Sequence, residues 1–171
     1  MANTSVDPGV LTGIAALGLT LTGFSGLVAV LGSRDTAQWT KGELFQFIEM
    51  ITVSLAVTFM AFVPILASTI LSDQVGLRVS NGVIAGVHAV LLVRGVRKVV
   101  MDPEARRAFA RGVLKFLTGG GILTITAGFA SALGLINTQS FTILLNLLWM
   151  FFVATVQFVQ LLAKHWEVDD A

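Results

Sequence analysis

The sequence predicts an all-α, polytopic bundle of transmembrane helices, and three observations lead to this fold class. Hydrophobic residues make up 55% of the chain, and the mean hydropathy is +0.85. Charged residues make up only 12%, roughly half the share of a soluble domain. The apolar residues are also gathered into long runs, and a soluble core of this size could not bury them all. We therefore expect one transmembrane domain over residues 1–171.

The first two expected spans have the length that a bilayer requires, which is about 20 mainly apolar residues. The first span, 9–32, lies between Asp7 and Arg34 and contains no charge. The second span, 43–72, is uncharged over most of its length and contains Pro64. This proline predicts a kink, which membrane helices tolerate.

The third expected span is the least apolar. It is placed at 77–96, where only residues 79–93 lie between Arg78 and Arg94. Crossing the bilayer here requires both arginine side chains to extend toward the headgroups. The last two spans are expected at 116–136 and 140–163, joined by a tight turn.

The distribution of positive charge predicts the orientation. Seven of the eleven Lys and Arg residues gather around the loop 97–115: Arg94, Arg97, Lys98, Arg106, Arg107, Arg111 and Lys115. Positive residues mark the cytoplasmic side, so five spans place the N-terminus outside and the C-terminus in the cytoplasm. The alternative has four spans, in which the third segment does not cross and the N-terminus is cytoplasmic. We prefer five spans, because residues 79–93 are too apolar for an aqueous loop.

The basic loop is expected to form a helix of its own. Asp102 has the character of an N-cap, and Pro103 and Glu104 suit a first turn. Four basic side chains, those of Arg106, Arg107, Arg111 and Lys115, would then contact anionic lipid or a protein partner. The alternative is a collar of charge that only sets orientation.

Small residues recur at about every fourth position on three spans. The glycines expected at helix contacts are Gly18 and Gly26, Gly82 and Gly86, and Gly120 and Gly128. Missing side chains let two backbones approach closely, which drives helix association in lipid. These contacts could form within one chain or between the chains of a homo-oligomer.

Four polar residues are candidates for a polar path through the membrane: Asn81, His88, Glu49 and Asn146. Polar groups at this depth are costly and usually face protein or water. For His88, the alternative is a buried imidazole bonded to a neighbouring helix. Glu49 would need Arg94 as its partner if the second helix begins near Lys41, whereas it would lie among the headgroups if that helix begins at Met50.

No catalytic motif, metal site or cofactor is expected. The chain has no cysteine, and its His and carboxylate residues lack metal-ligand spacing. No nucleophile and base form a visible pair, so we do not expect an enzyme. A net charge of +1 gives no general attraction for nucleic acid.

Two segments of the chain resemble uncharacterised small bacterial multi-span membrane proteins. They are LFQFIEMITVSLAVTFMAFVPIL at 44–66 and LLNLLWMFFVATVQFVQLL at 144–162. The resemblance lies in a charged start to the second span, a proline deep within it and a last span with a polar tip. It implies a similar layout, and it implies no ligand or catalytic residue.

These observations predict a small homo-oligomeric channel or transport-type protein of the bacterial inner membrane. The alternative is an accessory subunit that transports nothing and binds its partners through the glycine-rich helix faces and the basic loop.

Overall fold

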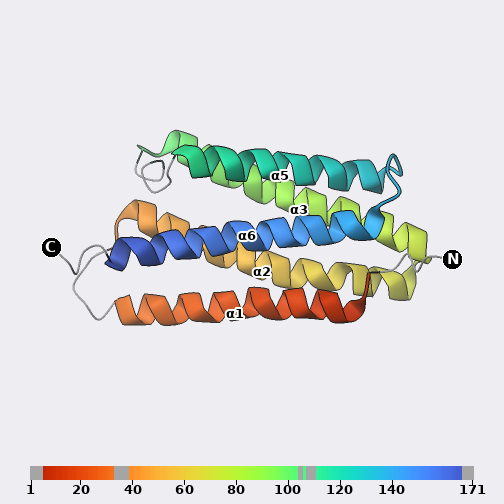
Figure 1. The fold of residues 1–171 in the computed structure, drawn as a ribbon, viewed down its shortest axis with the longest axis horizontal. Helices are drawn as coiled ribbons and strands as arrows, with labels where there is room; N and C mark the ends of the chain where they lie inside the picture. The colour runs from red at the N-terminus through yellow and green to blue at the C-terminus, as the bar shows by residue number, and fades with distance from the viewer. Residues whose placement is uncertain (1–5, 33–38, 104–105, 107–110, 167–171) are drawn as a thin grey trace.

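The computed structural model is an all-α bundle (Figure 1). The structure describes residues 6–32, 39–103, 106 and 111–166, and these contain five long helices and no strand. The helices are α1 (Pro8–Gly32), α2 (Lys41–Ile70), α3 (Asp73–Met101), α5 (Arg111–Ala132) and α6 (Gln139–Trp166).

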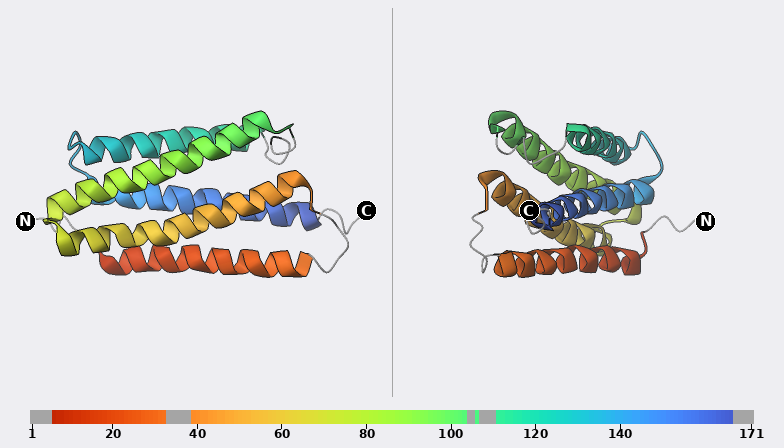
Figure 2. Two further views of the ribbon diagram at one scale, coloured as in Figure 1. Left: turned by 180° about the vertical axis from the view of Figure 1, so that it is seen from behind. Right: turned by 60° about the vertical axis from the view of Figure 1, so that its left-hand side comes forward.

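Successive helices run in opposite directions along one long axis (Figures 1 and 2). Helix α1 packs on α2 at one side of the bundle, and α5 packs on α3 and α6 at the other. The end where α2 and α5 begin carries most of the described positive side chains, and we call it the basic end: Lys41, Arg94, Arg97, Lys98, Arg106 and Lys115. Arg78 lies toward the opposite end of α3.

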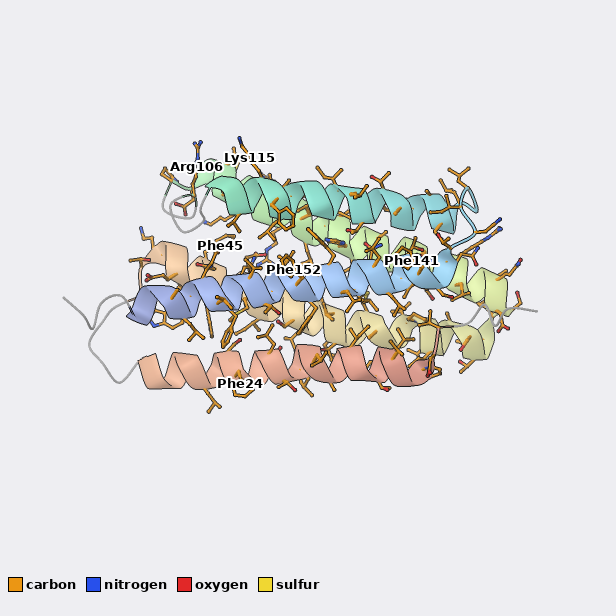
Figure 3. All side chains as sticks on the ribbon, viewed as in Figure 1. Phe24, Phe45, Arg106, Lys115, Phe141 and Phe152 are labelled. Atoms are coloured by element: carbon orange, nitrogen blue, oxygen red, sulfur yellow. The ribbon has the colours of Figure 1, made fainter. Side chains whose placement is uncertain are left out.

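Four helices are long and apolar enough to cross a membrane, namely α1, α2, α5 and α6. Their outer surfaces are apolar as well: Leu123 is 69% exposed, and Phe24 points away from the bundle (Figure 3). Water would be a poor solvent for such surfaces, whereas lipid is a good one. The chain therefore has the build of a multi-pass membrane protein. Helix α3 is as long as its neighbours but is not among the four apolar helices.

The core lies between α1, α2, α3 and α6. Val57, Ile84, Ile143 and Leu147 are fully buried there. The buried residues of α2 recur at helical spacing and continue through Pro64, which lies within the helix. Three of the helices that pack in the core, α2, α3 and α6, also carry the candidate polar residues.

The bounds of α5 and α3 differ from those expected. Helix α5 ends at Ala132 rather than at 136, because Gly134 adopts a positive φ of 74°. The N–H of Leu135 then donates to the Ala130 carbonyl at 2.9 Å, a bond that closes the helix end. Helix α3 covers 73–101 and so extends beyond the expected 77–96 at both ends.

Asp102, which was expected to begin a helix, is the C-cap of α3. Its backbone N–H donates to the Lys98 carbonyl at 2.9 Å. Its carbonyl also accepts from the Arg106 N–H at 3.0 Å. Most of the amphipathic helix expected beyond Asp102 lies outside the described residues.

Candidate functional site

A hydrogen-bonded polar group joins α3 to α6 toward the end opposite the basic one. The Asn81 amide donates to the carbonyls of Leu77 and Gln139, each at 3.0 Å. Its Oδ1 accepts from the Thr142 hydroxyl at 2.8 Å. Asn81 and Thr142 are both almost fully buried. Each polar atom of the Asn81 side chain therefore has a protein partner, as burial in an apolar medium requires.

A second polar group joins three helices at the middle of the bundle. His88 Nδ1 of α3 lies 3.0 Å from Asn146 Oδ1 of α6. The Asn146 amide nitrogen donates to the carbonyls of Thr124 on α5 and Thr142 on α6, at 2.9 and 3.1 Å. Since both bonds use the amide nitrogen, Oδ1 is the acceptor and His88 Nδ1 carries the proton. The Nε2 atom of a neutral His88 is then an acceptor, and it faces Gly121.

Glu49 forms an ion pair with Arg94. Helix α2 begins at Lys41 after a capping box made by Thr40 and Glu43, so Glu49 lies two turns inside the helix. Its side chain is 5% exposed, and its Oε1 lies 3.1 Å from Arg94 Nε. Helix α2 thus begins near Lys41, and Arg94 is the partner of Glu49 that the sequence predicts for that helix start.

Three glutamines form a polar cluster beside Glu49. Gln46 Nε2 donates to the Gln157 carbonyl at 3.2 Å and to Gln160 Oε1 at 3.1 Å. The side-chain oxygens of Gln46 and Gln157 are buried and have no hydrogen-bond partner among the described residues. These glutamines are not among the residues that the sequence predicts to line a polar path. The available signal was their helical spacing, with Gln46 three residues before Glu49.

A cavity of about 80 Å³ lies between α2, α3, α5 and α6. It extends from His88, at the middle of α3, toward Val99 near the basic end. Four of its lining residues are polar: Glu49, His88, Thr118 and Gln157. The rest of its wall is apolar. Asn81 and Asn146 do not line the cavity, so the four residues expected along one path divide between this cavity and the bonded group beyond it.

The predicted glycine contacts divide into two kinds. Gly18 lies close to Thr58 of α2, Gly120 to Trp149 of α6, and Gly128 to Ala85 of α3. Gly82 is in ordinary contact with Ala132, with 3.6 Å between an added Cβ and the alanine Cβ.

The remaining two glycines have no such neighbour. A Cβ added to Gly26 or Gly86 would meet nothing within 4 Å among the described residues. Gly86 faces outward and the polar face of α3 packs inward, so these two glycines leave backbone available at the surface of the bundle.

The basic residues expected to contact lipid lie at one end of the bundle. Arg106 and Lys115 are both exposed there (Figure 3). Arg107 lies outside the described residues. Arg111 is the first residue of α5, and its side chain is not described.

The fold and the site together define an all-α multi-pass membrane protein with a polar centre and an adjoining cavity. No group of three His, Cys, Asp or Glu residues in the described part of the chain could hold a metal ion. Comparison with known proteins finds no family model, curated protein or solved structure that matches the chain. The resemblance to small bacterial membrane proteins stays a prediction.

Proposed function

We propose that all five helices cross the membrane, with the N-terminus outside and the basic end in the cytoplasm. The direction of the helices supports this topology. Helices α2 and α5 both begin at the basic end, so the chain must return between them, and α3 makes that return (Figure 1). If α3 did not cross, α2 and α5 would be consecutive spans, and consecutive spans must run in opposite directions. Helices α2 and α5 instead run in the same direction. Positive charge at the basic end agrees with a cytoplasmic location.

Within this topology the protein is a small transport-type protein or channel of the bacterial inner membrane, and its solute site is the cavity. The observation that carries the proposal is the convergence of Glu49, His88 and Gln157, from three helices, on one buried space. Membrane proteins keep ionisable and polar groups at such depth mainly where they serve a function. The acceptor Gln157 Oε1 has no hydrogen-bond partner among the described residues, so a solute or water can use it beside the Glu49 carboxylate.

The bonded groups beyond the cavity give the path an asymmetric form. Asn81, Thr142 and Asn146 have partners within the protein and hold α3 against α6. In our proposal these bonds close the outer half of the path, and the cavity forms its inner half. Passage of a solute requires the His88–Asn146 bond to open.

Flux into liposomes tests the proposal. The purified protein is reconstituted, and the entry of protons, potassium and glycerol is compared with that into empty liposomes. We expect faster entry of at least one probe, and we expect Glu49→Gln and His88→Ala to reduce it. Glu43→Gln is the matched control, because glutamine also serves at this position of a capping box. No flux of any probe, or equal flux in all variants, would contradict the proposed path.

An accessory subunit is the second candidate function, and the open surfaces at Gly26 and Gly86 favour it. Small residues on an unoccupied helix face allow a second helix to approach closely, either from a copy of this chain or from another protein. In this case a distinct protein should co-purify with the chain and be lost in Gly86→Leu. A change in oligomer size in the same variant would instead indicate self-association.

A further inference from the structure

A groove runs between α2 and α3 at the basic end, and Phe45 lines both this groove and the cavity. It encloses about 730 Å³, and its wall is mostly apolar. The apolar part includes Ile48 of α2 and Val90 and Val93 of α3. Val90 is 67% exposed, so the groove opens to the surroundings of the bundle. In a membrane, those surroundings are lipid.

The end of the groove nearest the loop is positively charged. Arg94, Arg97 and Lys98 line it. Val90, Arg94 and Arg97 follow one another at helical spacing and share a face of α3. Val90 and Arg97 are seven residues apart, which is about 10 Å along a helix. The groove therefore changes from apolar to basic over roughly the distance that separates acyl chains from phosphates at a bilayer surface.

The charge of the groove is only partly neutralised by the protein. Arg94 contacts Glu49 through Nε, and 52% of its side chain remains exposed. Lys98 Nζ lies 3.4 Å from Asp102 Oδ2. Arg97 forms no ion pair with any residue that the structure describes. Three cations thus face two carboxylates, and the Glu49 carboxylate lies on the inner side of Arg94.

We propose that this groove binds one anionic glycerophospholipid, with an acyl chain along Ile48, Val90 and Val93 and the phosphate beside Arg94 and Arg97. Basic pockets between spans on the cytoplasmic side suit such headgroups, and an aliphatic chain matches the apolar wall. The proposal requires the basic end to lie at a membrane surface. It does not require the protein to transport a solute, so it can stand where the flux experiment fails.

Lipid binding can be measured on the whole purified chain in mild detergent. Native mass spectrometry counts the lipid bound after addition of phosphatidylglycerol or of phosphatidylcholine, and inorganic phosphate is a third arm. We expect one phosphatidylglycerol to bind and to raise the thermal midpoint, and we expect little response to phosphatidylcholine or phosphate. Arg97→Gln should weaken phosphatidylglycerol binding about fivefold, the usual effect of one basic residue near a lipid surface.

Two further variants separate the groove from general charge. Val93→Trp fills the apolar part without changing charge, and it should also reduce binding. Lys115, which the sequence predicts to contact lipid, lies at the same end but outside the groove, so Lys115→Gln should leave the binding of the one lipid in the groove unchanged. Equal losses in Arg97→Gln and Lys115→Gln would overturn the proposal in favour of a diffuse basic collar. Equal binding of both lipids, or a response to phosphate alone, would overturn it as well.

Discussion

The indole of Trp149 occupies the space that a side chain at position 120 would need. A Cβ added to Gly120 would overlap Trp149 Cζ2. The ring is also held from its other sides, since its centroid lies 5.4 Å from that of Phe116 and 5.5 Å from that of Phe152. A glycine is therefore required here by a side chain on the facing helix and not by the backbone conformation.

We predict that Gly120→Ala destabilises the protein by about 1 to 3 kcal/mol, the usual cost of an overpacked site. The neighbouring substitution Gly119→Ala is the control, because its Cβ would meet nothing within 4 Å among the described residues. Alanine is also the better helix former, so Gly119→Ala should leave stability unchanged or raise it. Thermal unfolding in detergent, followed by circular dichroism, measures both midpoints. Equal midpoints for the two variants would show that Trp149 moves aside at no cost.

At the level of the helices, the polar residues of α3 fasten it to α6. Burial of Asn81 and His88 on the inward face of α3 explains how a helix with charged ends packs among apolar ones. The His88–Asn146 bond is the direct side-chain link between these helices at mid-depth. The Thr124 carbonyl extends the link to α5 through Asn146.

A double-mutant cycle measures this link. We predict a coupling free energy of about 0.6 kcal/mol, and no more than about 1.7 kcal/mol, between His88→Ala and Asn146→Ala, which are the average and the maximum for hydrogen bonds between membrane helices. The control cycle pairs His88→Ala with Thr126→Ala, whose exposed hydroxyl bonds only to the Ile122 carbonyl of its own helix. Reversible unfolding in mixed micelles gives the free energies. Additive effects in the first cycle would mean that His88 and Asn146 do not interact.

Hydrophobicity predicted the helices better than it predicted their ends. Long apolar runs indicate a span regardless of its partners, so the four apolar helices could be found from the sequence. The end of α5 depends on the backbone conformation of Gly134, and the apolar residues after Ala132 hide it. The start of α2 followed from Thr40 and Glu43 only once the capping box was visible.

For the candidate site, the sequence could predict which residues share a helix face but not which residues they meet on other helices. Helical spacing placed Asn81 and His88 on one face, and polarity made them candidates. Which residue on another helix each one meets depends on how α3, α5 and α6 rotate about their axes, and no pattern within one helix contains that information. The ion pair of Glu49 and Arg94 was the exception, because opposite charges at the same depth have few other partners.

For the whole molecule, the decisive question is whether α3 crosses the bilayer. The chain contains no cysteine, so single cysteines can be introduced without background labelling. Five spans place Ser72 outside the cell, whereas four spans place it inside. Ser72 makes no capping bond with its side chain, so Ser72→Cys should not disturb the start of α3.

We predict that a membrane-impermeant maleimide labels Ser72→Cys on intact cells. Asn137→Cys, in the connection between α5 and α6, should be labelled in either topology and controls for expression. Arg106→Cys, at the basic end, should be labelled only after the cells are opened. Protection of Ser72→Cys together with labelling of Asn137→Cys would favour four spans and would remove α3 from the membrane.

Arg94 lines the groove and forms an ion pair with Glu49, which lines the cavity. Its guanidinium is therefore shared between Glu49 on one side and any anion that approaches from the bilayer on the other. A phosphate that draws this charge outward leaves the carboxylate less compensated, and a cation near the carboxylate releases the arginine toward the phosphate. Because such linkage is reciprocal, the lipid composition of the membrane would change the affinity of the cavity for a cationic solute. The bound cation would in turn change the affinity of the groove for the anionic lipid by the same factor.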